Sequence, residues 1–259
     1  MLLALLFIGV GYALALGYGD LAPEAWLSLL CLALAALAVA SPRWRALGHG
    51  LFICTALALA VHLLPGFHNA QVLDNARLSA DSVPYSFKLN LDKPLIGLWL
   101  LLVCPWVLGV PPRGLPRLAL VLGGTCLGVL GLAVALGVIG WAPKWPDVGW
   151  LWLANNLLLV SLTEELLFRG YIQGGLSRLL ADRRYGQSVA LGASSLLFGL
   201  AHLGLGGRWA LLAGLAGVGY GLAWRYGGLF AALACHVLLN VLHFGLFSYP
   251  MGCGSPLCA

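Results

Sequence analysis

Residues 118–139 have the sequence LALVLGGTCLGVLGLAVALGVI, which contains no charged side chain. A helix needs about 20 apolar residues to cross the hydrocarbon core of a bilayer, so this stretch is long enough to span it. Comparable stretches lie on both sides and fill most of the chain. They are roughly residues 2–18, 24–41, 46–64, 95–111, 117–141, 149–169, 187–205, 208–225 and 229–247. We therefore predict an all-α polytopic membrane protein with eight to nine transmembrane helices in one bundle.

The composition excludes a soluble domain. Hydrophobic residues make up 61% of the chain and charged residues 9%, against about 45–50% and about 25% in soluble domains. Most basic residues lie between the apolar stretches, at Arg43, Arg45, Arg113, Arg117 and in the run 178–184. Their positions follow the positive-inside rule and indicate an N-terminus on the inner side. Because no basic face carries interleaved aromatic residues, we expect the lipid bilayer and no nucleic acid as a partner.

One long polar connection interrupts the apolar pattern, at residues 65–94. Loops of this length are usually functional or disordered, and its mixed charges and aromatics fit an ordered lid or substrate-docking segment as well as a solvated connector. We divide the chain into N-terminal transmembrane helices with this loop (1–148), a catalytic core (149–247) and a polar tail (248–259).

Charged side chains occur inside one apolar stretch. Residues 161–170, Ser-Leu-Thr-Glu-Glu-Leu-Leu-Phe-Arg-Gly, carry Glu164, Glu165 and Arg169. Each charge at the centre of a lipid-exposed helix costs about 2.5–3.5 kcal/mol, so these groups must face each other or a polar cavity. Glu165 and Arg169 are four residues apart and share a helix face, which predicts an ion pair. Glu164 points about 100° away and remains free for another task.

Two later stretches supply polar partners. Phe198 and His202 are spaced i,i+4, and so are His236 and Asn240. A single histidine in a membrane helix is more often an interhelical hydrogen-bonding group than a catalyst. Two histidines, an asparagine and two glutamates within the last four stretches make a functional site the stronger interpretation.

Together these residues form three motifs in order along the chain: Glu164-Glu165-x-x-x-Arg169, Phe198-x-x-x-His202 and His236-x-x-x-Asn240. In this arrangement the chain resembles the CAAX protease and bacteriocin-processing family, which includes the type II CAAX prenyl endopeptidase. The resemblance covers about residues 149–247, and the ordered set of motifs is specific where a single one would be weak.

The resemblance implies a glutamic intramembrane endopeptidase that uses neither a metal nor another cofactor. In such an enzyme Glu164 acts as general base and activates a water together with His202, while His236 and Asn240 hold the oxyanion. Donors aimed at a developing oxyanion are worth about 3 kcal/mol each. The remaining motif residues orient the site; they are Glu165, Arg169 and Phe198.

The same resemblance implies a protein substrate anchored in the membrane, with a processing signal near its C-terminus of the CAAX or sorting-tail kind. We expect a multi-pass protein of the bacterial inner membrane.

Other interpretations remain open. A zinc site could use Glu164, His202 and His236, although the chain has no His-Glu-x-x-His motif and Arg169 would oppose a divalent cation. The chain could also be a non-proteolytic immunity or scaffold protein that retains the motifs. A transporter is a further alternative, but the two halves show no matching broken helices.

Overall fold

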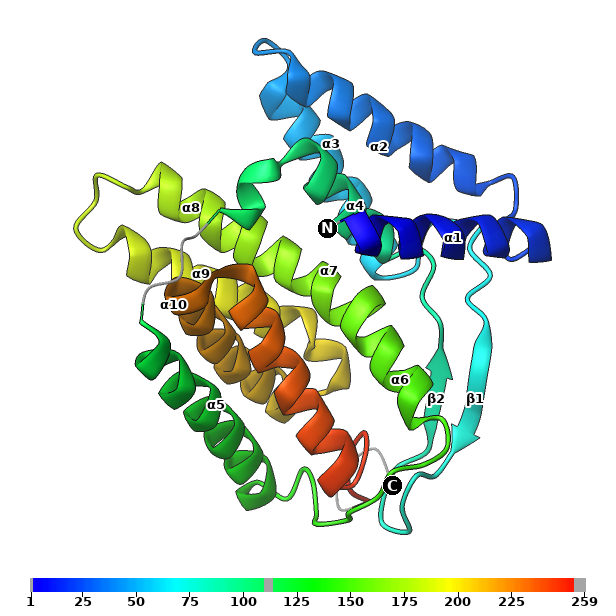
Figure 1. The fold of residues 1–259 in the computed structure, drawn as a ribbon, viewed down its shortest axis with the longest axis vertical. Coiled ribbons are helices and arrows are strands. Elements are labelled where there is room, and N and C mark those ends of the chain that lie inside the picture. Colours follow the sequence, from blue (N-terminus) through cyan, green and yellow to red (C-terminus); the bar gives the residue numbers. More distant parts are fainter. Residues whose placement is uncertain (1, 110–113, 254–259) are drawn as a thin grey trace.

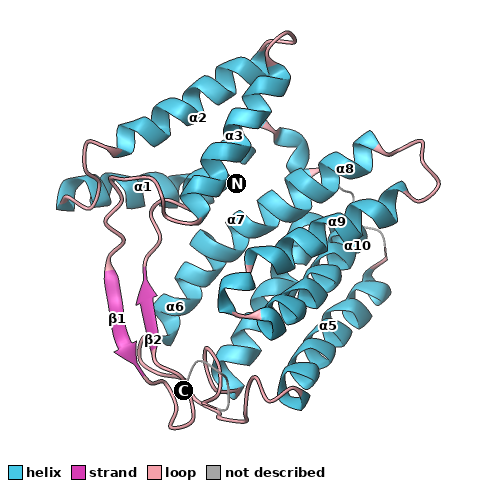
Figure 2. Cartoon of the chain, turned by 180° about the vertical axis from the view of Figure 1, so that it is seen from behind, coloured by secondary structure: helices cyan, strands magenta, loops and turns pink. Residues whose placement is uncertain are grey.

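The computed structural model describes residues 2–109 and 114–253, and Arg113, used above for orientation, lies outside them. The described chain is mostly helical (Figures 1 and 2). Its α-helices are α1 (Leu2–Tyr18), α2 (Ala25–Ala40), α3 (Arg45–Ala60), α4 (Pro94–Val103), α5 (Leu115–Ala135), α6 (Gly149–Asn155), α7 (Leu162–Glu165), α8 (Gly174–Leu179), α9 (Gly186–Ala201) and α10 (Gly207–Leu246). Short 3₁₀ turns follow α4 and α9, at Pro105–Leu108 and Leu203–Leu205.

Three helices of the described chain are long and apolar enough to cross a membrane: Pro116–Ala135, Gly149–Leu179 and Gly207–Leu246. The prediction of a multi-pass helical membrane protein is confirmed at this level. The last of these helices, α10, bends at Gly228, whose φ of 72° and ψ of −165° are not helical. This backbone conformation is essentially restricted to glycine, so α10 consists of two segments on either side of Gly228, as the separate apolar stretches predicted.

The helices of the second half pack around α10. Helices α5 and α9 both lie along it (Figure 1). Small residues allow the close approach of α9 and α10: a Cβ on Gly199 would lie 2.8 Å from the Ala210 carbonyl oxygen, and one on Gly217 3.2 Å from the Ser195 Cα. A larger side chain at either position would push the two helices apart.

Helices α2, α3 and α4 form a second group at one side of the bundle. The Trp99 ring of α4 stacks on Phe52 of α3 with ring centroids 3.9 Å apart, and its Nε1 donates to the Leu32 carbonyl of α2 (2.9 Å). Helix α4 also packs on the helix 149–179, where a Cβ on Gly97 would meet the Thr163 hydroxyl at 3.0 Å. These contacts fix one face of the helix that carries the glutamates.

The expectation of an all-α fold is wrong at the loop 65–94. This segment contains an antiparallel hairpin of β1 (Gln71–Ala76) and β2 (Tyr85–Lys88), visible beside α6 in Figure 2. Aromatic and β-branched residues such as Val72 and Phe87 favour strands, but the run is too short and too irregular for its alternation to stand out. The loop is therefore an ordered element and not a solvated connector.

The hairpin is joined to the C-terminal segment, and we call residues 81–87 with 248–253 the terminal cap. The Val83 N–H donates to the Met251 carbonyl (3.0 Å), and the Cys253 N–H donates to the Asp81 carbonyl (2.8 Å). Phe87 packs with Trp152 and Phe244 in a small apolar cluster. Burial raises the pKa of the Tyr249 hydroxyl, which therefore stays neutral inside the cap. The cap closes the end of the bundle where α6 begins and α10 ends.

Candidate active site

The glutamates lie on a helix that is not uniformly α-helical. Between Gly149 and Leu179 the hydrogen bonding changes to π-helical at Asn156–Ser161 and again at Leu166–Gln173. Glu164 and Glu165 occupy the short α-helical piece between these two segments. Widened turns of this kind occur frequently at functional sites, because they shift side chains off the regular helical register.

Glu165 is the buried centre of the cluster. Its side chain is fully buried, and its Oε2 lies 3.3 Å from Nε of the equally buried Arg169, so the predicted i,i+4 ion pair is present. The other carboxylate oxygen, Oε1, lies 2.8 Å from Nδ1 of His236 on α10. One carboxylate thereby connects the helix 149–179 to α10 and fixes the orientation of the His236 ring.

Glu164 occupies a different environment. Its side chain is 21% exposed, and its Oε2 lies 4.0 Å from Nε2 of His236. This separation exceeds a hydrogen bond of 2.7–3.2 Å, but it is short enough for a single small molecule to contact both atoms. The two adjacent glutamates therefore face opposite nitrogens of the same imidazole, and only Glu165 is tied down.

Aromatic rings enclose the charged groups. The His236 ring stacks on Tyr220 with centroids 4.4 Å apart and an interplanar angle of 14°. The Arg169 guanidinium lies over Phe198 (4.5 Å to the ring centroid) and over Tyr220 (5.1 Å), and its Nη2 donates to the Gly217 carbonyl (3.2 Å). Cation–π contacts of this kind stabilise a buried guanidinium whose Nη1 makes no hydrogen bond within the described chain.

His202 joins the cluster through Phe198. Its Nδ1 lies 2.8 Å from the Phe198 carbonyl oxygen, and its ring centroid lies 4.7 Å from that of Phe198, which in turn is 5.8 Å from His236. Since a carbonyl oxygen only accepts, Nδ1 carries the hydrogen and Nε2 is left as an acceptor. In the part of the chain that the structure describes, no hydrogen bond or ion pair joins His202 to Glu164.

Asn240 lies one helical turn beyond His236 and is held from the helix 149–179. Its Nδ2 donates to Oδ1 of Asn156 (3.2 Å), which also accepts a hydrogen bond from the Ser161 hydroxyl (3.1 Å). Asn156 and Ser161 are buried, whereas Asn240 is half-buried. The two hydrogen bonds that Oδ1 accepts fix the Asn156 amide, and Asn156 in turn orients Asn240.

The structure thus brings Glu164, Glu165, Arg169 and His236 into direct contact, with His202 and Asn240 at the edge of the same cluster. Sequence reasoning missed Asn156 and Tyr220. A signal for Asn156 existed, because the pair Asn155-Asn156 is polar inside an apolar stretch. Tyr220 carried no such signal, since its stacking on His236 depends on how α10 bends.

The cluster has acceptors and a buried cation but no arrangement of metal ligands. Among residues 2–109 and 114–253, no group of three or more His, Cys, Asp or Glu side chains is placed to hold a metal ion. A partly exposed carboxylate beside an imidazole whose other nitrogen is anchored is suited to removing a proton from water. The half-buried Asn240 amide adds a donor within one helical turn of His236.

One comparison with known proteins gives a match that covers this cluster. Residues 145–242 match the family model described as "Type II CAAX prenyl endopeptidase Rce1-like". The matched range contains all three motifs and none of the residues of the terminal cap. No curated protein and no solved structure matches the chain.

Proposed function

Residues 145–242 belong to the Rce1-like type II CAAX prenyl endopeptidase family, and from this we propose that the chain is an intramembrane endopeptidase. Its substrate is a membrane-anchored protein, cut near its C-terminus at a CAAX-like or sorting-tail signal. The observation that carries the proposal is the His236 imidazole, anchored by Glu165 and facing the partly exposed Glu164. A scaffold or immunity protein would not require a free carboxylate beside an anchored imidazole.

In the proposed mechanism Glu164 removes a proton from a water molecule, and His202, with Nε2 free to accept, assists in orienting that water. The activated water attacks the scissile carbonyl. His236, protonated on both ring nitrogens, and Asn240 donate hydrogen bonds to the resulting oxyanion, and the proton taken by Glu164 passes to the leaving amine. Glu165, Arg169 and Phe198 do not react; they keep His236 in place.

Three further features belong to the proposal. The shorter apolar helices α2, α3, α4 and α9, with α1, would cross the membrane beside the three long ones, and the two halves of α10 would each cross once, giving eight to nine crossings in one bundle. Residues 149–247 would form the catalytic core, and residues 1–148 with the loop 65–94 an N-terminal unit. We place the protein in the bacterial inner membrane.

Cleavage of defined peptides tests the proposal. Purified full-length protein in detergent would be given two internally quenched peptides. One ends in a farnesylated Cys-aliphatic-aliphatic-Met sequence, and the other in an unprenylated apolar tail. We expect fluorescence to rise with one of them, and mass spectrometry to locate a single cut near the C-terminus.

Two variants distinguish enzyme from contaminant. Glu164→Ala should lower the rate by about 10²–10⁴, the usual contribution of a general base. Leu127→Ala, on the exposed face of α5, serves as the matched control and should cleave at the wild-type rate. If neither peptide is cut, or if Glu164→Ala cuts as fast as the control, the chain does not hydrolyse such substrates.

A further inference from the structure

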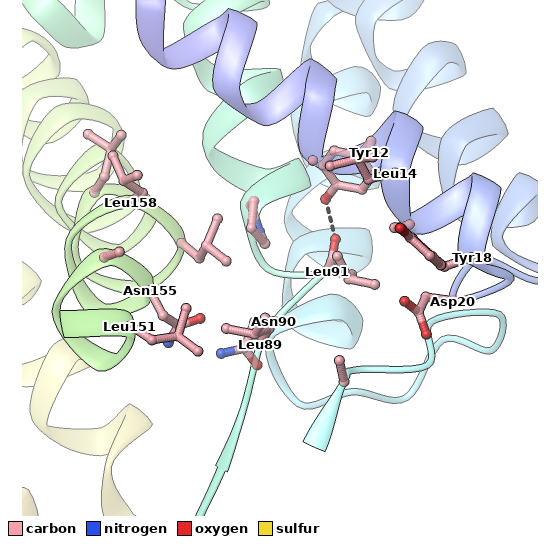
Figure 3. A pocket seen from close by; sticks show the side chains of 17 residues that line it. Tyr12, Leu14, Tyr18, Asp20, Leu89, Asn90, Leu91, Leu151, Asn155 and Leu158 are labelled. Atoms are coloured by element: carbon pink, nitrogen blue, oxygen red, sulfur yellow. Dashed lines mark hydrogen bonds between the residues drawn. The ribbon is translucent and has the colours of Figure 1, made fainter. Parts of the chain in front are cut away.

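A cavity lies beside the helix 149–179 (Figure 3). It has a volume of about 350 Å³, within the range of roughly 300–1,000 Å³ typical of ligand sites. Its walls are α1, the segment 89–94 that follows β2, and residues 151–162. None of the proposed catalytic residues lines it, and most of its wall lies outside the family match, so it is separate from the site described above.

The wall is mostly apolar, and two of its polar side chains have acceptor oxygens without a hydrogen-bond donor among the residues that the structure describes. Asn155 is 7% exposed, and its Oδ1 has no hydrogen-bond partner within the described chain. At the mouth, the Asp20 carboxylate also makes no hydrogen bond or ion pair with any described residue, and Figure 3 shows both side chains at the cavity. Of the two hydroxyls that α1 brings to the cavity, that of Tyr12 already donates to the Leu91 carbonyl, and that of Tyr18 belongs to an exposed side chain. A buried amide oxygen without a donor is costly, so the cavity favours an occupant that brings N–H groups.

The segment after β2 contains one residue whose backbone groups are unpaired among the described residues. The Leu89 N–H donates to the Ala70 carbonyl (3.0 Å), and the Leu91 N–H donates to Oδ1 of Asn69 (2.8 Å). Asn90 lies between these two bonded residues. Asn90 lines the cavity and makes no hydrogen bond within the described chain. An unpaired backbone N–H and C=O are the groups that an incoming peptide strand binds.

The charge of the cavity wall further restricts the chemical class of ligand that can bind. Asp20 is the one charged residue among those that line the cavity, and no lysine, arginine or histidine does so. A fatty-acid carboxylate or a phosphate headgroup would meet an uncompensated negative charge there. A peptide with apolar side chains and a terminal basic residue meets apolar walls, the unpaired backbone of Asn90 and a carboxylate.

We propose that this cavity binds an extended apolar peptide segment ending in lysine or arginine, which pairs with the backbone of Asn90 and places its basic side chain at Asp20. The Asn155 amide oxygen accepts a further N–H from the same segment. Binding at this site requires no hydrolysis, so it can hold or fail independently of the proposed protease activity.

Photo-crosslinking to the purified full-length protein tests the proposal. The probes are benzophenone-labelled octapeptides of alternating leucine and alanine, one ending in lysine amide and its twin in glutamate. We expect saturable labelling within residues 89–94 or 151–162, with the lysine peptide about fivefold tighter, as expected of one partly exposed ion pair. Asp20→Lys should reverse this preference. A backbone N-methylated lysine peptide should bind about tenfold more weakly, because it lacks the N–H donors.

A substitution that fills the cavity provides a second test of the proposal. Leu158→Trp fills the cavity and should abolish labelling by both peptides, whereas Leu127→Trp on the exposed face of α5 should leave it unchanged. Should Leu158→Trp fail to fold, as judged by its melting temperature, Leu151→Trp at the rim replaces it. Equal labelling by all three peptides, or labelling unaffected by these changes, would overturn the proposal and leave a cavity that lipid tails fill.

Discussion

The two adjacent glutamates should respond in opposite ways to the same substitution. Glu165→Gln removes the negative charge that holds both Arg169 and His236. The new amide can still accept from His236 Nδ1, but its NH₂ group would face the Arg169 Nε, which lies 3.3 Å from the carboxylate now. Arg169 then keeps only the Gly217 carbonyl and aromatic faces. Breaking a buried pair costs about 3–5 kcal/mol, which lowers the melting temperature by roughly 6–20 °C for a chain of this size.

Glu164→Gln should leave folding almost untouched. Its side chain is 21% exposed and touches His236 only at 4.0 Å, so we expect less than about 1 kcal/mol of lost stability. Turnover should fall by about 10²–10⁴, because an amide cannot take the proton from water. The assay measures detergent-extracted yield, melting temperature and peptide cleavage for both variants in parallel. Near-normal cleavage by Glu164→Gln, together with a well-folded but inactive Glu165→Gln, would refute the assignment and exchange the two roles.

Three further outcomes are expected. Dialysis against EDTA should leave cleavage unchanged, because the proposed chemistry moves protons between side chains and water; about one equivalent of zinc per chain, lost together with activity, would contradict this. Asn156→Ala should slow turnover about tenfold by releasing Asn240, with KM nearly constant, whereas Thr55→Val, which also loses one buried hydrogen bond, should cleave normally. Gly228→Ala should cost about 1–3 kcal/mol, seen as a lower melting temperature, because φ is 72° there. Gly124→Ala, with open space around it, is its control, and equal melting of the two would show that the bend tolerates a side chain.

Much of the helical framework was predictable because bilayer spans leave a strong signal. The stretch 24–41 corresponds to α2 at Ala25–Ala40, and the stretch 187–205 to α9 at Gly186–Ala201. The ion pair of Glu165 with Arg169 followed from helical spacing alone. Local periodicity determines such features, so a single sequence is sufficient for them.

Features that depend on contacts between distant segments were not predictable. The hairpin of β1 and β2 is stabilised partly by residues 251–253, and the sequence of its own short strands does not indicate these contacts. The π-helical turns beside Glu164 have the residue composition of an ordinary apolar helix, so the sequence does not indicate them. The bond from His236 to Glu165 was also missed, because spacing within a helix says nothing about which glutamate a neighbouring helix will meet.

The terminal cap sets an order of events during biosynthesis. Asp81 and Cys253 are bonded to each other, yet 253 − 81 = 172 residues separate them along the chain. At a synthesis rate of about 5–20 residues per second, the hairpin is synthesised roughly 10–30 s before the C-terminal segment of the cap. Throughout that interval the backbone groups of Asp81 and Val83 lack the partners that the C-terminal segment supplies. The cap can therefore close only after α10 has been synthesised.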